Sequence, residues 1–205
     1  MSFNTSGTIS EVLIGTGVLY YADRTTSSLV FPADNSGAWE NPTSLSVPFS
    51  EVGYSEDGWT LEVDKTFEDV MVAEEIDPIK TIKTAQEVRI TGELAQASLA
   101  NLKLAMAGGV SAADTPSSGY TQLTPPSTDG FLEYGLILRV NAPGASEGGT
   151  QKVRDIYAPR AVNVGAFSMV HAKAPQKVTI TVEYKLLKPN SDAPFSHLFK
   201  VIDEV

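Results

Sequence analysis

The chain has 205 residues, of which 42% are hydrophobic and 20% charged, and its formal net charge is −10 at pH 7. This length suits one sizeable domain or two small ones, and the ordinary apolar content excludes a fully disordered chain. The negative charge argues against binding to nucleic-acid phosphates by counterion release, and the lack of cysteine excludes disulfides and thiolate chemistry.

The first quarter of the chain predicts one strand and a long irregular segment. Residues 15–23 are aromatic-rich and bounded by glycine, which is typical of a strand. Residues 24–57 are rich in Ser, Pro, Gly and Asn, with short strands expected near 29–31 and 45–47. Because so long a loop is uncommon unless it is functional, we expect residues 24–57 to form an interaction loop.

Two half-buried strands are expected in the stretch that follows. Residues 59–66 alternate apolar and polar side chains from Trp59 onward, and extended chain is expected to continue over 67–75. A turn is expected at Asp77-Pro78. Residues 87–95 alternate again, and the following side chains share one face: Val88, Ile90, Gly92 and Leu94.

The same stretch is strongly acidic. Twelve of the 25 acidic residues lie between residues 51 and 93, with only four of the 15 basic residues. The ordinary interpretation of such a stretch is a solvated face.

Directly after residue 95 the period changes to that of a helix. Apolar side chains recur at i, i+4, i+7 and i+11, at Ala95, Leu99, Leu102 and Met106. Gly108-Gly109 are expected to end the helix, since glycine tolerates the left-handed cap conformation. We expect Leu99, Leu102 and Met106 to pack against a sheet.

The second half of the chain again predicts strands separated by loops. Residues 110–130 are expected to be a loop, and residues 188–205 a loop that ends in an apolar and acidic tail. Strands are expected at 131–140, at 153–162 returning antiparallel, at 163–172 and at 177–187. The last alternates most clearly, with these side chains expected to point inward: Val178, Ile180, Val182, Tyr184 and Leu186. About eight strands and one helix indicate a single mainly β domain over residues 1–205, a β-sandwich or barrel-like fold with one flanking helix.

No catalytic or metal-binding motif is found. The sequence GASEG (144–148), followed by Asp155 and His171, has the chain order of a serine hydrolase. The segment after it is strand-like, whereas a nucleophile elbow requires a helix there, so we expect a hairpin loop around Ser146 and no enzyme activity. His171 and His197 lack the spacing of metal ligands, and no metal or cofactor is expected.

The sequence also shows no targeting signal and no membrane-spanning segment. No run of 18 apolar residues suggests a membrane span. The N-terminal MSFNTSGTIS lacks the basic and apolar regions of a secretory signal.

The direct junction of a strand with a helix, ended by Gly-Gly, resembles the major tail tube proteins of long-tailed (siphovirus-type) bacteriophages. Five segments carry the resemblance: GYSEDGWTLEV (53–63), FEDVMVAEEIDPIKT (67–81), EVRITGELAQASLANLKLAMAGG (87–109), and PQKVTITVEYKLL (175–187) with FKVID (199–203), which resemble the closing strands of that family. It covers about 53–109 and 153–203. Gln96 departs from the pattern, because an acid is expected there in many relatives and would favour the helix N-terminus.

The resemblance implies a β-sandwich with a flanking helix, whose strands join those of neighbouring subunits in an intersubunit barrel. Rings, usually hexameric, would stack into a hollow tube through which DNA leaves the capsid without specific binding. The loops at 24–57 and 110–130 and a C-terminal arm at 188–205 would bridge rings. The implied partners are other copies of the chain, a tape measure protein and tail initiator or terminator proteins. The implied location is the virion tail, with assembly in the host cytoplasm and no membrane.

A tube gives the acidic stretch a role, because a like-charged wall keeps DNA sliding. Strand alternation makes four acids candidates for the lumen: Glu62, Asp64, Asp69 and Glu74. The sequence does not decide whether Glu68 and Glu75 also face the lumen, because the register could shift at Phe67. A contractile-tail or injection-machine tube remains open as a variant. The alternative from another class is a virion-surface or carbohydrate-binding β-sandwich module, which would stay monomeric and present a concave aromatic face.

Overall fold

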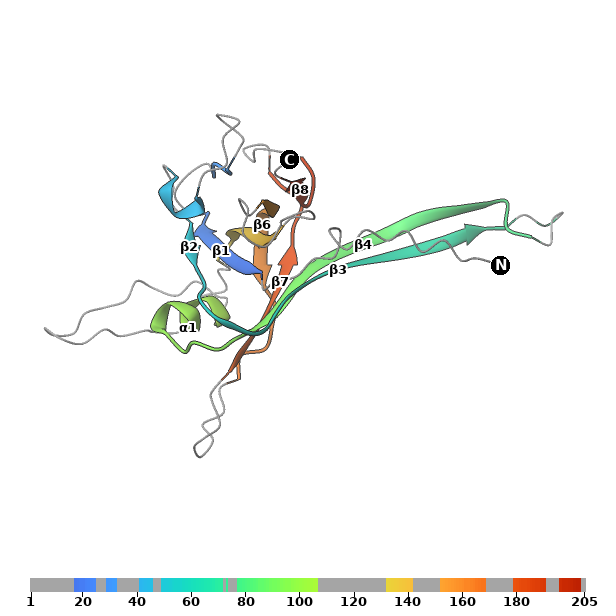
Figure 1. Ribbon diagram of the computed structural model, residues 1–205. Helices are drawn as coiled ribbons and strands as arrows, with labels where there is room; N and C mark the ends of the chain where they lie inside the picture. Colours follow the sequence, from blue (N-terminus) through green and yellow to red (C-terminus); the bar gives the residue numbers. More distant parts are fainter. Residues whose placement is uncertain are drawn as a thin grey trace, which may run out of the picture.

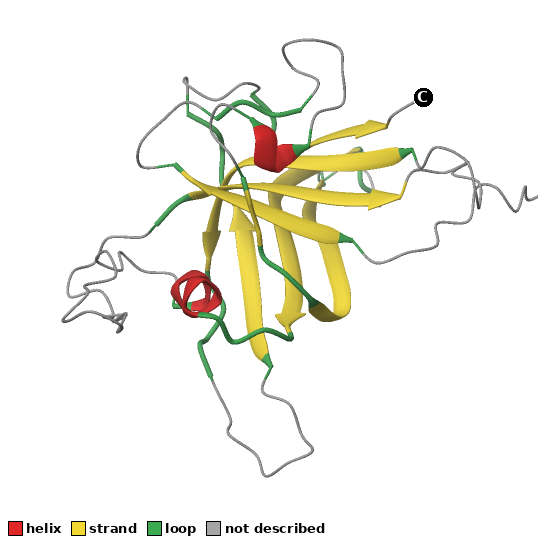
Figure 2. Cartoon of the chain, turned by 60° about the vertical axis from the view of Figure 1, so that its left-hand side comes forward, coloured by secondary structure: helices red, strands yellow, loops and turns green. Residues whose placement is uncertain are grey.

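The structure is a computed structural model and describes residues 17–24, 29–32, 41–45, 49–71, 73, 77–106, 132–141, 152–168, 179–190 and 196–203. Within these residues the chain is mainly β, with eight antiparallel strands in one sheet and one α-helix. Figure 2 shows the sheet bent into two sets of strands that cross, which gives a sandwich-like arrangement. The predicted fold class is therefore confirmed.

The element bounds are as follows: β1 Val18–Asp23, the 3₁₀-helix η2 Pro42–Ser44, β2 Ser50–Glu51, β3 Ser55–Val70, β4 Lys80–Leu94, α1 Leu99–Ala105, β5 Tyr134–Asn141, β6 Val153–Asn163, β7 Ile180–Leu186 and β8 Lys200–Asp203. The strand order is β2-β1-β5-β6-β7-β4-β3, and β8 also pairs with β6. Strand β6 pairs with β8 through residues 154–157 and with β7 through residues 161–163, so the sheet divides along this strand.

Several expected strands are confirmed and others differ. β1, β5, β6 and β7 lie within one to three residues of their predicted bounds, and β6 returns antiparallel to β5. β3 begins at Ser55, before the expected strand at 59–66, and runs on to Val70 as the extended chain expected from residue 67. β4 begins at Lys80, well before the expected strand at 87–95. Residues 164–168 are not in a strand, so the expected strand at 163–172 is wrong over this part. No apolar period predicted β8, but it lies in the FKVID segment (199–203), whose resemblance to closing strands indicated a strand there.

The main hydrophobic core lies between the two sets of strands and under α1. It is built from the side chains predicted to alternate inward on β4 and β7, including Val88, Ile90, Val182 and Tyr184, all fully buried. Trp59 and Leu61 of β3 pack against its margin. The inward faces of these strands were therefore correctly predicted from period-2 alternation.

A second, smaller core lies on the other side of the sheet. It is formed by side chains from the irregular segment before β3 and from the β1, β5 and β6 strands, namely Ala22, Leu29, Phe31, Leu45, Phe49, Ile137 and Tyr157. Phe31 stacks on Tyr157 with ring centroids 4.8 Å apart. The described parts of residues 24–57 thus cover the sheet, and the interaction role of this loop stays a prediction.

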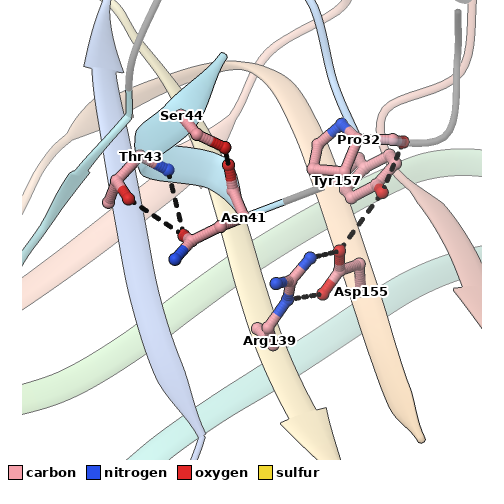
Figure 3. Close-up of polar contacts among 7 residues, drawn as sticks. All are labelled: Pro32, Asn41, Thr43, Ser44, Arg139, Asp155 and Tyr157. Carbon is pink, nitrogen blue, oxygen red and sulfur yellow. Dashed lines mark hydrogen bonds and ion pairs between the residues drawn. The ribbon is translucent and has the colours of Figure 1, made fainter. Parts of the chain in front are cut away.

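A buried ion pair lies beside this second core (Figure 3). Arg139 and Asp155 are direct partners on β5 and β6, and the guanidinium Nε and a terminal nitrogen donate to Oδ1 and Oδ2 at 2.7 and 2.6 Å. The Tyr157 hydroxyl donates to the Pro32 carbonyl oxygen at 2.8 Å and lies 3.2 Å from Asp155 Oδ2. The Asp155 side chain is fully buried, and the guanidinium pair satisfies its charge.

Helix α1 begins after the N-cap Ser98, whose hydroxyl accepts from the Asn101 backbone N–H at 3.1 Å. Its buried residues are Asn101, Leu104 and Ala105. Leu99 is 42% exposed, so the expectation that it packs against the sheet is wrong. Leu102 is partly buried against the main core, and Met106 is the half-exposed C-cap.

The helix faces the sheet this way because two buried asparagines anchor it. Asn101 Nδ2 donates to the carbonyl oxygens of Val52 and Gln96 at 3.0 and 2.8 Å. At the other end, Asn163 Nδ2 donates to the Leu104 and Ala105 carbonyl oxygens at 2.9 and 3.1 Å. The helix's orientation is thus set by amide hydrogen bonds as well as by apolar packing.

Candidate assembly interface on the β3–β4 hairpin

The β3–β4 hairpin projects far from the sandwich (Figure 1). β3 pairs along its length with β4, from Ser55 opposite Leu94 to Val70 opposite Lys80. β7 pairs with β4 only from Arg89 to Leu94. Beyond this point the two strands pair with no further strand among the described residues.

The projecting half of the hairpin is exposed on both faces. Every residue of 62–71 and of 80–86 is exposed, whereas Val88 and Ile90, next along β4, are fully buried. Phe67 is 56% exposed and Val63 is 37% exposed. An isolated two-stranded hairpin is marginally stable in water, so this half of the hairpin lacks the packing that usually stabilises such a structure.

Strand alternation gives the hairpin two different faces. We define its core-side face by Val63, Lys65, Phe67 and Asp69, because these β3 residues continue the row of Trp59 and Leu61 that packs on the main core. We define its acidic face by Glu62, Asp64 and Glu68, which point the other way. The pairing skips Thr84 where Thr66 and Phe67 oppose Ala85 and Lys83, so the extra residue lies in β4 and the alternation of β3 continues unbroken.

This register decides where the lumen candidates lie. Glu62 and Asp64 share the acidic face as expected. Asp69 lies on the core-side face, where its Oδ1 accepts a hydrogen bond from Thr81 at 2.6 Å, so the expectation that it shares a face with Glu62 is wrong. Glu68 takes its place on the acidic face. Glu74 and Glu75 lie outside the described residues.

A network of charged side chains lies at the base of the hairpin, where β7 ends its pairing with β4. Arg89 donates to Glu87 Oε1 from Nε at 2.7 Å and forms an ion pair with Glu183, and Lys185 Nζ lies 3.1 Å from Glu87 Oε1. The hydrogen bond from Lys185, followed by that from Arg89, holds the pKa of Glu87 below its ordinary value. Glu87 is therefore neutralised within its own chain. Of the acids on this face, Glu62 lies opposite Arg89, Asp64 lies opposite Glu87, and Glu68 lies farther out.

Close packing also fixes the hairpin base. A Cβ at Gly92 would lie 2.5 Å from Cε3 of Trp59, its cross-strand partner. The indole therefore lies directly over the glycine, and the two strands meet closely where they leave the sandwich.

The apparent hydrolase residues are not brought together in the described part of the chain. Asp155 is engaged with Arg139 and Tyr157, while Ser146 and His171 lie outside the described residues. Over the residues that can be inspected, no three His, Asp or Glu side chains gather in a way that could hold a metal ion. No helix in the described part has the length and apolar character needed to span a bilayer.

Comparison with known proteins gives little beyond this geometry. No protein-family model matches the chain, and no curated protein matches it. Among solved structures, it is similar to a chain in the cryo-EM structure of the anti-feeding prophage (AFP) baseplate, 6-fold symmetrised, with 8% sequence identity and a TM-score of 0.46. The match covers 93% of this chain and 95% of that chain. The function proposed below depends on the hairpin and the sequence pattern, and not on this likeness.

Proposed function

We propose that this chain is a structural subunit of a phage tail tube. Copies assemble into rings through their β3–β4 hairpins, the hairpins join into a barrel, and the rings stack into a hollow conduit for DNA. The chain acts by assembly and not as an enzyme. The observation that carries this proposal is a long hairpin whose outer half is exposed on both faces and unpaired on both edges among the described residues.

Unpaired edges support an assembly role because they are costly to leave in a folded protein. A long exposed edge strand presents a row of backbone N–H and C=O groups that recruits another strand. Closing many such strands into a barrel removes every edge at once. A hairpin that extends beyond its own core, with exposed Phe67 and Val63, is suited to pairing within such a barrel.

The two hairpin faces support a particular orientation in the barrel. The core-side face continues the row that packs on the sandwich, so in a barrel it would lie toward the protein wall. The acidic face would then line the lumen with Glu62, Asp64 and Glu68. DNA phosphates would meet like charge over distances comparable to the Debye length of about 8 Å at physiological salt.

Negative-stain electron microscopy of the purified chain over a range of concentrations tests the proposal. We expect rings or tubes about 10 nm across, the size expected for a ring of such domains. A variant in which residues 64–86 are replaced by a short turn keeps the cores and should stay monomeric, with an unchanged β-rich circular dichroism spectrum.

A full-length chain that remains monomeric at every concentration and salt, also in the presence of a tail initiator complex, contradicts the proposal. Monomers that bind glycans would favour the alternative surface-module function. If the shortened variant forms tubes equally well, the tube function stands, but assembly through the hairpin is contradicted.

A further inference from the structure

The two open edges of the hairpin differ in charge, and this difference can select how copies meet. We propose that β3 of one copy pairs antiparallel with β4 of the next copy, and that opposite edge charge favours this head-to-tail pairing over β3 with β3 or β4 with β4. This inference rests on the proposed tube function and names the partner surface, which is the β4 edge of a second copy.

Both edges are available over matching lengths. Residues 63–70 of β3 oppose residues 80–88 of β4 within the hairpin. The outer edge of β3 pairs with no strand in the described chain, and the outer edge of β4 is open until Arg89, where β7 begins to pair. Each copy thus offers two different edges of about equal length, which is what a repeating contact requires.

The edges carry opposite net charge. Residues 63–70 hold three acids against one base, a net charge of −2, from Asp64, Glu68, Asp69 and Lys65. Residues 80–88 hold two bases against one acid, a net charge of +1, from Lys80, Lys83 and Glu87. Because Glu87 is already bonded to Lys185 and Arg89, the two lysines dominate the free part of the β4 edge.

The charges of the two edges therefore make the possible strand pairings differ in stability. Opposite charges facing each other across strands stabilise a pair, and like charges destabilise it. Pairing β3 with β3 sets acids against acids and closes after two copies. Pairing β3 with β4 sets acids against lysines and leaves one free edge of each kind, so that the contact repeats and closes as a ring.

Disulfide trapping tests the pairing, since the chain has no native cysteine. Two neutral positions on the acidic-face side of β3, Thr66 and Val70, and two on β4, Ile82 and Ala85, are changed to cysteine one at a time. Each β3 variant is then mixed with each β4 variant, assembled and oxidised. Adjacent strands lie about 4.8 Å apart and second neighbours about twice as far, so only adjacent strands are joined.

Head-to-tail pairing predicts disulfide-linked dimers in at least one of the four mixtures and at most about a tenth of that yield in any variant alone. Dimers that form within single-variant preparations as readily as in mixtures overturn the inference while leaving the tube intact. Tubes that give no dimer in any mixture overturn it as well. A wild-type chain that never assembles overturns the proposed function and this inference together.

Charge exchange tests the cause of the selection. The Lys80→Glu/Lys83→Glu variant has two acidic edges, and the Asp64→Lys/Glu68→Lys variant has two basic edges. Each alone should need a protein concentration about tenfold or more above wild type to assemble, whereas their equimolar mixture and the variant with all four changes should assemble near the wild-type concentration. Wild-type behaviour of both separate variants, or failure of both the mixture and the fourfold variant, contradicts charge selection.

Discussion

At the scale of single residues, three buried polar side chains organise the fold, and none of them was identified from the sequence as a core residue. Asn101 and Asn163 are 3% exposed and Asp155 is fully buried. Apolar periodicity does not detect such residues, because their burial depends on backbone carbonyls or charged partners from distant segments. Asp155 was considered only as part of a hydrolase-like sequence order, and its actual partner is Arg139.

Asn163→Ala should destabilise the protein strongly. Besides the two carbonyls of α1, its Oδ1 accepts from the backbone N–H groups of Gly165 and Glu183 at 2.9 and 3.3 Å. Removing the amide leaves these buried groups unsatisfied, so the free energy of unfolding should fall by roughly 2–4 kcal/mol. Denaturant unfolding measures this. The exposed Asn190, whose side chain accepts from Arg160, is the control, and an equally small effect of both alanine variants would contradict the anchoring role.

Two ion pairs that use adjacent β6 residues should differ greatly in strength. Arg139–Asp155 and Arg154–Asp203 are both bidentate ion pairs, but only Asp155 is buried. Asp155→Ala removes the buried carboxylate that pairs with the half-buried guanidinium of Arg139 and should cost about 3–5 kcal/mol, whereas Asp203→Ala should cost roughly 0–1 kcal/mol. Thermal unfolding of the two variants compares them, and equal shifts in Tm would contradict the assigned burial.

At the scale of elements, alternation identifies strands that begin beside the core, and it misses the exposed start of β4. The alternation at 59–66 begins with half-buried Trp59 and Leu61 and runs on into exposed residues, where extended chain was also expected over 67–70. Residues 80–86 face solvent on both sides and show no apolar period, so this part of β4 was not expected. Four-residue β8 has no apolar period, because Val201 is exposed and only Ile202 packs inward, so only the resemblance of FKVID (199–203) to closing strands indicated it.

The buried face of the helix was predicted wrongly because the helix was assumed to begin too early. The apolar series from Ala95 assumes a helix that includes it, but α1 begins after Ser98 and has only seven residues. Asparagine at position 101 then takes a buried place that an apolar pattern assigns to its neighbours. The existence of the helix was predictable from its residues, and its rotation was not.

Leu104→Ala and Leu99→Ala test the corrected face. Leu104 is 1% exposed in the main core, so its truncation should cost about 2–5 kcal/mol. Leu99 is 42% exposed, and its truncation should change stability by about 0.5 kcal/mol or less. Chemical denaturation of both variants is the measurement. A larger loss for Leu99→Ala than for Leu104→Ala would restore the original face.

At the scale of the whole molecule, the described strands of the sandwich pack on two cores, whereas the outer half of the hairpin is exposed on both faces. Two cores stabilise the body from both sides of the sheet, while the hairpin has two chemically different faces and, within the described ranges, two edges without a strand partner beyond Arg89. The resemblance in sequence pointed to assembly, but only the register shows that Glu68, and not Asp69, joins Glu62 and Asp64. This arrangement makes the charge of the acidic face a testable property of the proposed tube.

Glu62→Lys should make assembled tubes retain DNA. The residue lies on the acidic face just inside the edge segment 63–70, so ring pairing should persist while phosphate-binding lysines repeat around each ring. Co-sedimentation of short duplex DNA with tubes should rise from wild type to Glu62→Gln to Glu62→Lys, and it should fall at high salt. Val201→Lys, on exposed β8 of the body, is the control for added charge. Equal retention by all these tubes would mean that Glu62 does not face the DNA path.

Amide hydrogen exchange on residues 62–70 and 80–88, compared between dilute monomer and assembled protein, tests the central role of the hairpin most directly. In one hairpin, alternate N–H groups of each strand point outward and exchange freely. If hairpins pair into a barrel, these amides become hydrogen-bonded, and their exchange should slow by about 100-fold or more on assembly. Assemblies in which the outward amides exchange as fast as in the monomer would contradict the account, because the hairpin edges would then still be open.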